Sequence, residues 1–308
     1  MRNRFTLILL GCILLGVFET CKRGAPAKNS EPATISESEQ FVSDESFAPI
    51  LDEELYVFNS TKPGTKSTIT YKSENDVVRL LLNDSARFAF LSRKLSDGEI
   101  KALKARNLPV RVTKFAMDAV ALIVNEASAD TTISVSEIKK MLRGETKTDN
   151  SIVFDNPNSS LVRYLKDLAG TAQLEQKNIY ALKSNKEVIE YVSKHPKAIG
   201  IIGFSWLNDP DTDYAEAAKN VKTVAVKDDN NKEAPNQYFR PTQSTLYLKQ
   251  YPLMRDLYMV NCISSKNGLG AGFEHFIVSD KGQRIVLRSG LLPFLIPGRE
   301  IIIHSDKL

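Results

Sequence analysis

Residues 151–170 read SIVFDNPNSSLVRYLKDLAG. Ser151–Phe154 predicts a short buried strand, and Ser159–Ala169 predicts an amphipathic helix that ends at Gly170. The polar loop between them leads into serines of the kind that cap helices. A helix N-terminus carries unpaired backbone N–H groups and a partial positive charge, so this strand-loop-helix unit also suggests an anion-binding loop.

The same alternation of strands and helices continues on both sides of this unit. Capping boxes of the form Ser-x-x-Glu are expected to open helices at Ser96, Ser134 and Ser184. Asp118–Asn125 predicts a buried strand, and Ala198–Phe204 a strand broken by glycine. Further strands are expected at Thr68–Tyr71, Ala86–Leu91 and Val221–Val226, and helices at Asp76–Leu82 (capped by Asn75 or Asp76), Gly272–Val278 and Lys281–Ser289. This order predicts an α/β architecture with mostly parallel sheets.

Small hydroxyl residues recur where a strand or loop enters a helix. They lie in three segments, residues 43–50, residues 71–76 with the Ser92-Arg93 strand end, and residues 154–160 ahead of a helix that carries Arg163. Each serine taken alone is explained as a helix cap. Their repetition in one chain, with two arginines nearby, favours an anion site.

Patterns typical of enzymes, metal sites and nucleic-acid binding are not found in the sequence. The three histidines, His195, His275 and His304, lack a nucleophile partner, and no His/Cys/carboxylate spacing indicates a metal site. The 41 basic and 37 acidic residues give a net charge of +4 and are interspersed. We therefore expect no catalysis, no cofactor, no metal and no nucleic-acid partner.

The N-terminus predicts export and a lipid anchor. Two arginines precede an apolar run, Phe5–Phe18, that is too short to span a bilayer comfortably. A lipoprotein signal is expected over residues 1–21, with Cys21 acylated, followed by a flexible tether over residues 22–42. Cys12, which follows Leu-Leu-Gly, is the alternative acylation site, and an ordinary cleaved signal is the other reading. Cys262, in an apolar segment, is expected to pack in the core.

Seven segments, in their order along the chain, carry a resemblance to a known family. They are Asp44–Pro49, Phe90–Leu95, Asp118–Asn125, Asp155–Ser160, Ala198–Gly203, Tyr251–Arg255 and Phe276–Ile285. Over residues 44–293 the chain resembles the phosphate-binding proteins of bacterial ABC importers. It departs from that family at Ser160, where glycine is usual, at Leu161, where threonine is usual, and at Glu74 and Asp76, which add negative charge.

The resemblance implies a two-lobed periplasmic-binding-protein fold with two hinge crossovers and a central ligand cleft. The first lobe would comprise residues 43–118 and 250–308, and the second lobe residues 119–249. The ligand-binding residues that it implies are Ser46, Phe47, Ser73, Ser92, Arg93, Asn158, Ser159, Ser160 and Arg163.

The function implied is capture of inorganic phosphate or a similar oxyanion for an ABC importer. The partners would be the permease subunits and the membrane that holds the anchor, with the protein a monomer on the periplasmic side of the envelope. The alternative is a binding-fold lipoprotein whose ligand has changed, acting as a sensor or an envelope-interaction protein.

Acylation of Cys21 is testable by substitution. We expect Cys21→Ser to move the protein from the membrane pellet to the soluble fraction, because multiply acylated chains contribute about 0.8 kcal/mol per buried methylene to membrane binding. Fractionation followed by immunoblotting measures this. If Cys21→Ser stays in the pellet and Cys12→Ser is released, the acylated residue is Cys12.

Overall fold

The computed structural model describes residues 37–146, 150–174 and 177–298. The predicted signal, Cys12 and Cys21 lie outside the described residues. Within them, no helix is both long and apolar enough to cross a membrane.

The strands begin with β1, which includes residues 37–42 of the predicted tether. These residues are not a flexible tether, because they pair with β2 and because Phe41 and Val42 are buried. In chain order the strands are β1 (Glu37–Asp44), β2 (Thr65–Lys72), β3 (Phe88–Leu91), β4 (Arg111–Asn125), β5 (Thr132–Ser134), β6 (Ser151–Phe154), β7 (Ile179–Ala181), β8 (Ala198–Gly203), β9 (Val221–Thr223), β10 (Ala225–Lys227), β11 (Met254–Asn261) and β12 (Leu292–Pro293).

The helices alternate with these strands, as predicted. They are η1 (Glu45–Phe47), α2 (Ala48–Ser60), α3 (Glu74–Leu82), α4 (Asp97–Ala105), α5 (Val135–Arg143), α6 (Ser160–Ala169), α7 (Asn185–Lys194), η2 (Phe204–Leu207), α8 (Ala215–Lys219), α9 (Gln243–Tyr247), α10 (Leu269–Val278) and α11 (Asp280–Arg288), where η marks a short 3₁₀ helix.

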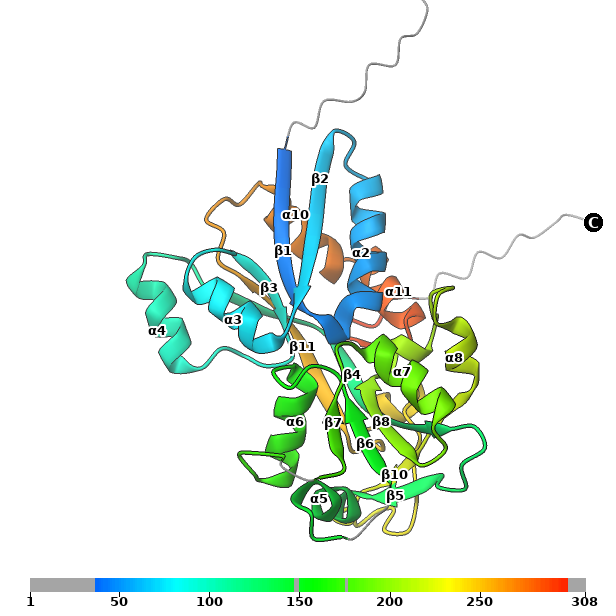
Figure 1. Cartoon of the computed structure of the whole chain (residues 1–308). Helices are drawn as coiled ribbons and strands as arrows, with labels where there is room; N and C mark the ends of the chain where they lie inside the picture. Colours follow the sequence, from blue (N-terminus) through cyan, green and yellow to red (C-terminus); the bar gives the residue numbers. More distant parts are fainter. Residues whose placement is uncertain (1–36, 147–149, 175–176, 299–308) are drawn as a thin grey trace, which may run out of the picture. The chain divides into compact units, whose positions relative to one another are not determined.

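The main sheet of the described residues has the strand order β2-β1-β3-β11-β4-β8-β6-β7, and β12 and β9 also pair with β4. We call the part built on β1, β2 and β3 the first lobe, and the part built on β6, β7 and β8 the second lobe (Figure 1). Pairs within each lobe are parallel, β1 with β2 and β3, and β6 with β7 and β8. The central pairs that involve β4 and β11 are antiparallel, so the sheet is more mixed than predicted.

Strand β4 joins the two lobes. Its 15 residues exceed the predicted strand, because its first part pairs with β11 and its second part pairs with β8. The chain returns through β11, and Tyr251, just before that strand, donates its hydroxyl to the Val120 carbonyl at 2.8 Å. The two crossovers are therefore hydrogen-bonded to each other. The predicted lobe boundaries at residues 118/119 and 249/250 stay predictions.

The predicted helix starts are largely confirmed. Ser96 and Ser134 form reciprocal capping boxes with Glu99 and Glu137. Ser184 caps α7, but the Glu187 carboxylate accepts from the Lys183 N–H instead of closing the box.

Two local predictions are wrong. Helix α3 begins at Glu74 and is capped by Ser73, not by Asn75 or Asp76, because the Ser73 hydroxyl accepts from the Asp76 N–H. The expected strand Val221–Val226 divides at Val224 into β9 and β10, which belong to different sheets.

The core of the first lobe is built on phenylalanine rings. Phe41, Phe88 and Phe273 are fully buried, with ring centroids of Phe41 4.9 Å from each of the other two. Cys262 is buried in a neighbouring apolar cluster of this lobe, as predicted, and burial raises the pKa of its thiol to about 11. In the second lobe, α7 packs on β8 through Val188 and Val192.

Gly200 sets how closely α7 approaches β8. A Cβ at Gly200 would lie 2.7 to 2.9 Å from side-chain atoms of Ile123, Val192 and Val188. We expect Gly200→Ala to lower the free energy of unfolding by about 1–3 kcal/mol, the usual result of overpacking. Thermal unfolding measures the change. Gly98→Ala is the control, since a Cβ at Gly98 meets nothing within 4 Å, and an equal loss in both variants would contradict this account of Gly200.

Candidate functional site

The site begins where β1 ends at Asp44. This residue is fully buried and caps η1, with its Oδ1 accepting from the Ser46 N–H at 3.0 Å. The Ser46 hydroxyl donates to the same oxygen. The first loop of the first lobe thus directs one backbone donor and one hydroxyl donor at a single carboxylate.

The second lobe supplies a matching pair of donors to that carboxylate. Ser160 is the first residue of α6, where the helix has no internal partner for its N–H. That N–H donates to Asp44 Oδ2 at 3.0 Å, and the Ser160 hydroxyl donates to Asp44 Oδ1 at 3.0 Å. The two hydroxyl oxygens, Ser46 Oγ and Ser160 Oγ, lie 3.1 Å apart. The structure therefore brings two predicted residues from separate lobes onto one anionic group.

Arg255 stands behind Ser160. Its Nη1 donates to Ser160 Oγ at 2.9 Å, which leaves the hydroxyl hydrogen of Ser160 for Asp44. Its Nε and Nη2 both donate to Asp118 Oδ2, at 2.9 and 2.8 Å. Its guanidinium lies over the Phe47 ring, 4.9 Å from the centroid. Because Asp118 and Arg255 face each other on β4 and β11, the crossovers themselves carry this buried ion pair.

Burial makes the charge on these carboxylates costly. Desolvation raises the pKa of Asp44, while the Ser46 hydrogen bond and the Arg255 charge act in the opposite direction. Desolvation also raises the pKa of Asp118, again opposed by Arg255. One arginine therefore serves two buried carboxylates, and the site carries no excess of positive charge.

A second pair of carboxylates lies beside Asp44. Desolvation raises the pKa of Asp155 well above its usual range, and the charge of Asp44 adds to that shift. Desolvation raises the pKa of Glu45 to about 7. The Asn185 amide donates to both, to Glu45 at 2.7 Å and to Asp155 at 3.2 Å. Since Glu45 belongs to the first lobe and Asn185 to the second, this is another contact between the lobes.

The predicted residues Ser92, Arg93 and Arg163 gather around the buried Glu74. Arg163 donates to the Glu74 carboxylate and, at 2.7 Å, to the Ser92 hydroxyl, which itself donates to Glu74 at 3.1 Å. Arg93 forms a bidentate pair with Glu99, at 2.8 and 2.7 Å. Both guanidiniums are thus paired with carboxylates, and the prediction that they contact an anion stays a prediction.

The remaining predicted residues lie at the edges of the site. Ser159 caps α6 and donates its hydroxyl to Asp155 at 2.5 Å. Ser73 caps α3, and the Asn158 carbonyl accepts from the Asn75 N–H at 3.3 Å. Ser159 and Ser73 thus act as helix caps, which is the alternative to anion binding that the sequence left open. Asn158 forms a contact between the lobes.

Sequence reasoning missed the charged centre of the site. Asp118 interrupts the apolar run from Phe115 to Val124 of β4, a pattern that can mark a paired buried charge. Arg255 stands next to Asp256 in β11 and gave no such signal. Asp44 was taken as part of the first loop and not as an acceptor. Nothing in the sequence around Asn185, apart from its position at a helix start, indicated that it would bond to the buried carboxylates.

A cavity of about 250 Å³ opens beside Asp44. Its lining combines carboxylates and hydroxyls with two lysines, and comprises Asp44, Glu45, Tyr71, Lys72, Ser73, Asp76, Asp155, Asn156, Ser159 and Lys183. Its lining includes residues of both lobes, such as Asp44 and Ser73 of the first lobe and Ser159 and Lys183 of the second.

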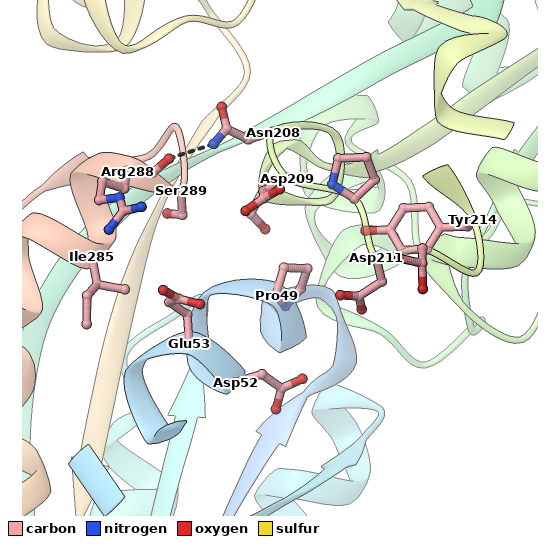
Figure 2. A pocket seen from close by; sticks show the side chains of 13 residues that line it. Pro49, Asp52, Glu53, Asn208, Asp209, Asp211, Tyr214, Ile285, Arg288 and Ser289 are labelled. Carbon is pink, nitrogen blue, oxygen red and sulfur yellow. Dashed lines mark hydrogen bonds between the residues drawn. The ribbon is translucent and has the colours of Figure 1, made fainter. Parts of the chain in front are cut away.

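A larger cavity, about 640 Å³, lies between α2, α11 and the segment after η2. Figure 2 shows Asp52 and Glu53 of α2 in its wall, with Asp209 and Asp211 from the segment after η2, and Arg288 at one side. The Asn208 amide donates to the Arg288 carbonyl at 2.6 Å. Four carboxylates against one guanidinium disfavour an anionic ligand there.

The described residues contain no group of three or more His, Cys, Asp or Glu side chains that could hold a metal ion. The chemistry at Asp44 is instead that of an oxyanion site, in which N–H and O–H donors from two lobes converge on one anionic group.

Two lobes, joined by crossing strands and contributing donors to one buried point, define a two-lobed ligand-binding protein. A sequence model described as the PBP superfamily domain matches residues 29–281. The chain therefore belongs to the PBP superfamily.

Known relatives extend this result. The phosphate-binding protein PstS of Borreliella burgdorferi is 29% identical over 262 residues, which cover 80% of this chain and 86% of the relative. The Staphylococcus aureus protein of the same name is 28% identical over 210 residues, 64% of this chain and 60% of the relative. A Clostridium perfringens crystal structure, assigned as a phosphate ABC transporter substrate-binding protein with bound phosphate, has a TM-score of 0.68 at 20% identity and covers 84% of this chain and 100% of its own. The predicted two-lobed fold is confirmed.

The position of Glu45 predicts a pH dependence of stability. Its pKa rises from 4.5 to about 7 in the folded protein, so between these values the folded state binds a proton that the unfolded state has released. The contribution of the Glu45 carboxyl to the free energy of unfolding is fully present below pH 4.5 and is lost as pH rises through 7. The loss is at most about 3.5 kcal/mol, at about 1.4 kcal/mol per pKa unit.

Urea unfolding across this pH range measures the loss. Glu45→Gln is expected to have a smaller fall in stability, because its amide cannot release a proton. Glu99→Gln is the control: Arg93 lowers the pKa of Glu99 to about 2, so that carboxylate stays ionised throughout the window. A wild-type pH slope in Glu45→Gln would contradict the assignment.

Proposed function

We propose that this chain is a membrane-anchored solute-binding lipoprotein that captures phosphate or a related oxyanion for an ABC importer. The observation that carries the proposal is the convergence of Ser46 and Ser160 donors, from separate lobes, on one anionic group. An oxyanion needs many donors when it leaves water, and charge-assisted bonds are the strong ones.

Two-lobed binding of this kind works through closure about the crossovers. An anion held by Ser46 alone would be bound by the first lobe only, and contact with Ser160 would require the second lobe to be closed on it. The names of the Borreliella burgdorferi and Staphylococcus aureus relatives support phosphate as the ligand. The same relationship supports permease subunits as partners and a binding role without catalysis. That the protein acts as a monomer is part of the proposal.

Anchoring remains part of the proposal. The apolar run that ends near Cys21 supports a lipoprotein on the periplasmic side of the envelope. The predicted tether, as far as the start of β1 at Glu37, would let the lobes reach a permease in the same membrane.

The alternative is a binding-fold lipoprotein whose ligand has changed. The observation that favours it is the acidity around Asp44, where Glu45, Asp155 and Glu74 are all close enough to affect buried pKa values. This many carboxylates near the site would weaken binding of a doubly charged anion. If no oxyanion binds, a role as a sensor or an envelope-interaction protein would follow.

Calorimetry at neutral pH tests the proposal. We expect the wild-type protein to bind phosphate with 1:1 stoichiometry. Ser160→Asp should lose more than 100-fold in affinity, since two charges 4 Å apart repel by about 4 kcal/mol at an effective dielectric constant of about 20. Ser160→Asn, which has a neutral side chain of the same shape, is the matched control and should bind within about tenfold of wild type.

Thermal melts establish that both variants are folded. Equal binding by Ser160→Asp and Ser160→Asn would place the anion elsewhere. If the wild-type protein binds neither phosphate nor sulfate, the changed-ligand alternative takes the place of the proposal.

A further inference from the structure

The donors that would hold an oxyanion are already used by the chain itself. The Asp44 carboxylate accepts four hydrogen bonds, from the N–H and hydroxyl of Ser46 and from the N–H and hydroxyl of Ser160. All three residues are buried. A carboxylate with this set of partners makes the same kind of contacts as an oxyanion ligand.

We infer that the Asp44 carboxylate is an internal competitor for the oxyanion site, which holds the two lobes together until an anionic ligand displaces it. The bonds to Ser46 are local, within one loop, whereas those to Ser160 cross between lobes and span 116 positions in the sequence. Losing Asp44 from the site would therefore remove the bonds to Ser160 and weaken the contact between the lobes, which would then rest on pairs such as Asn185 with Glu45 and Arg163 with Glu74 unless another anion replaced the carboxylate.

Charge explains why the two occupants exclude each other. Arg255 is the cation at this point, and two of its nitrogens already donate to Asp118. A dianion beside an ionised Asp44 would place two anionic groups on donors that suffice for one. Like charges in a buried site repel strongly, so the carboxylate has to move away.

The fold offers a place for the displaced carboxylate. The 250 Å³ cavity beside Asp44 has the carboxylates of Glu45, Asp76 and Asp155 in its lining, together with Lys72 of the first lobe and Lys183 of the second. A side-chain rotation at Asp44 would carry the carboxylate from the serines toward these ammonium groups, which would compensate its charge.

This role differs from that of a residue that accepts a hydrogen bond from the ligand. A ligand-accepting Asp44 would strengthen binding, and its removal would weaken it. A competing Asp44 lowers the apparent affinity, because ligand binding must first break the internal bonds. The direction of change on substitution separates the two roles.

The test uses Asp44→Ser and Asp44→Asn. Serine retains the ability to cap η1 without a charge, and asparagine retains the shape of the side chain. Asp280→Ser is the control for removing an aspartate from the same lobe, since Asp280 is exposed and pairs only within α11, with Arg284.

Two readouts are measured on protein freed of phosphate by dialysis. The first is the Kd for inorganic phosphate, measured by calorimetry. This readout rests on the proposed function, because it requires that the protein binds phosphate. We expect it to fall at least tenfold in either Asp44 variant and to stay unchanged in Asp280→Ser. The same or weaker binding by the Asp44 variants would overturn the inference.

The second readout does not depend on the ligand. Spin labels at Lys101→Cys on α4 and Lys140→Cys on α5 report the separation of the lobes, and the buried Cys262 is not expected to react. We expect one short distance in the wild-type background and a longer or broader distribution in Asp44→Ser. Identical distributions would overturn the inference, even if no form of the protein bound phosphate and the proposed function had failed.

Discussion

Burial of the Asp44 carboxylate between two lobes is the constraint on which the rest of the site depends. A buried charge without partners costs more than most folds can tolerate, so the chain has to deliver donors to it. It does so with one serine from each lobe, Ser46 at the end of β1 and Ser160 at the start of α6. Arg255 then fixes the Ser160 hydroxyl and balances part of the charge. The two lobes are therefore in contact at the point where Ser46 and Ser160 both donate to Asp44.

The crossover strands make this arrangement possible. β4 and β11 lie side by side at the centre of the sheet, and their facing residues Asp118 and Arg255 form an ion pair that is buried with them. Any change in the angle between the lobes occurs at these strands, directly behind the serines. An anion at the proposed site would therefore contact both lobes and, through Arg255, the crossover strands. This connection relates ligand capture to closure without a separate signalling element.

Much of this could be predicted from the sequence, because the signals are local. Each of these signals depends only on residues close by in the sequence. Examples are the capping serines Ser96 and Ser134, the left-handed glycines Gly144 and Gly170, and the buried strand around Asp118. The order of these segments predicted an α/β architecture, and the resemblance to the phosphate-binding proteins of ABC importers implied the two lobes. Ser46 and Ser160 could be named as candidate ligand residues, since each lies at the start of a helix.

The partners of the charges could not be predicted in this way. Whether Arg93 faces an anion or Glu99 depends on which side chains share a space after folding, and the spacing along the chain does not contain that information. The same holds for Asp44, which reads as an ordinary loop residue until Ser160 is brought beside it from 116 positions away.

The central claim is that the donors of Ser46 and Ser160 form an oxyanion site that the Asp44 carboxylate occupies in the absence of ligand. Crystallography with arsenate tests this claim most directly, because the anomalous scattering of arsenic locates the anion. The account predicts an arsenic peak within hydrogen-bonding reach of both serines, with the Asp44 side chain turned toward Lys72 and Lys183. A peak elsewhere in the protein, or at the serines with Asp44 still bonded to them, would contradict it.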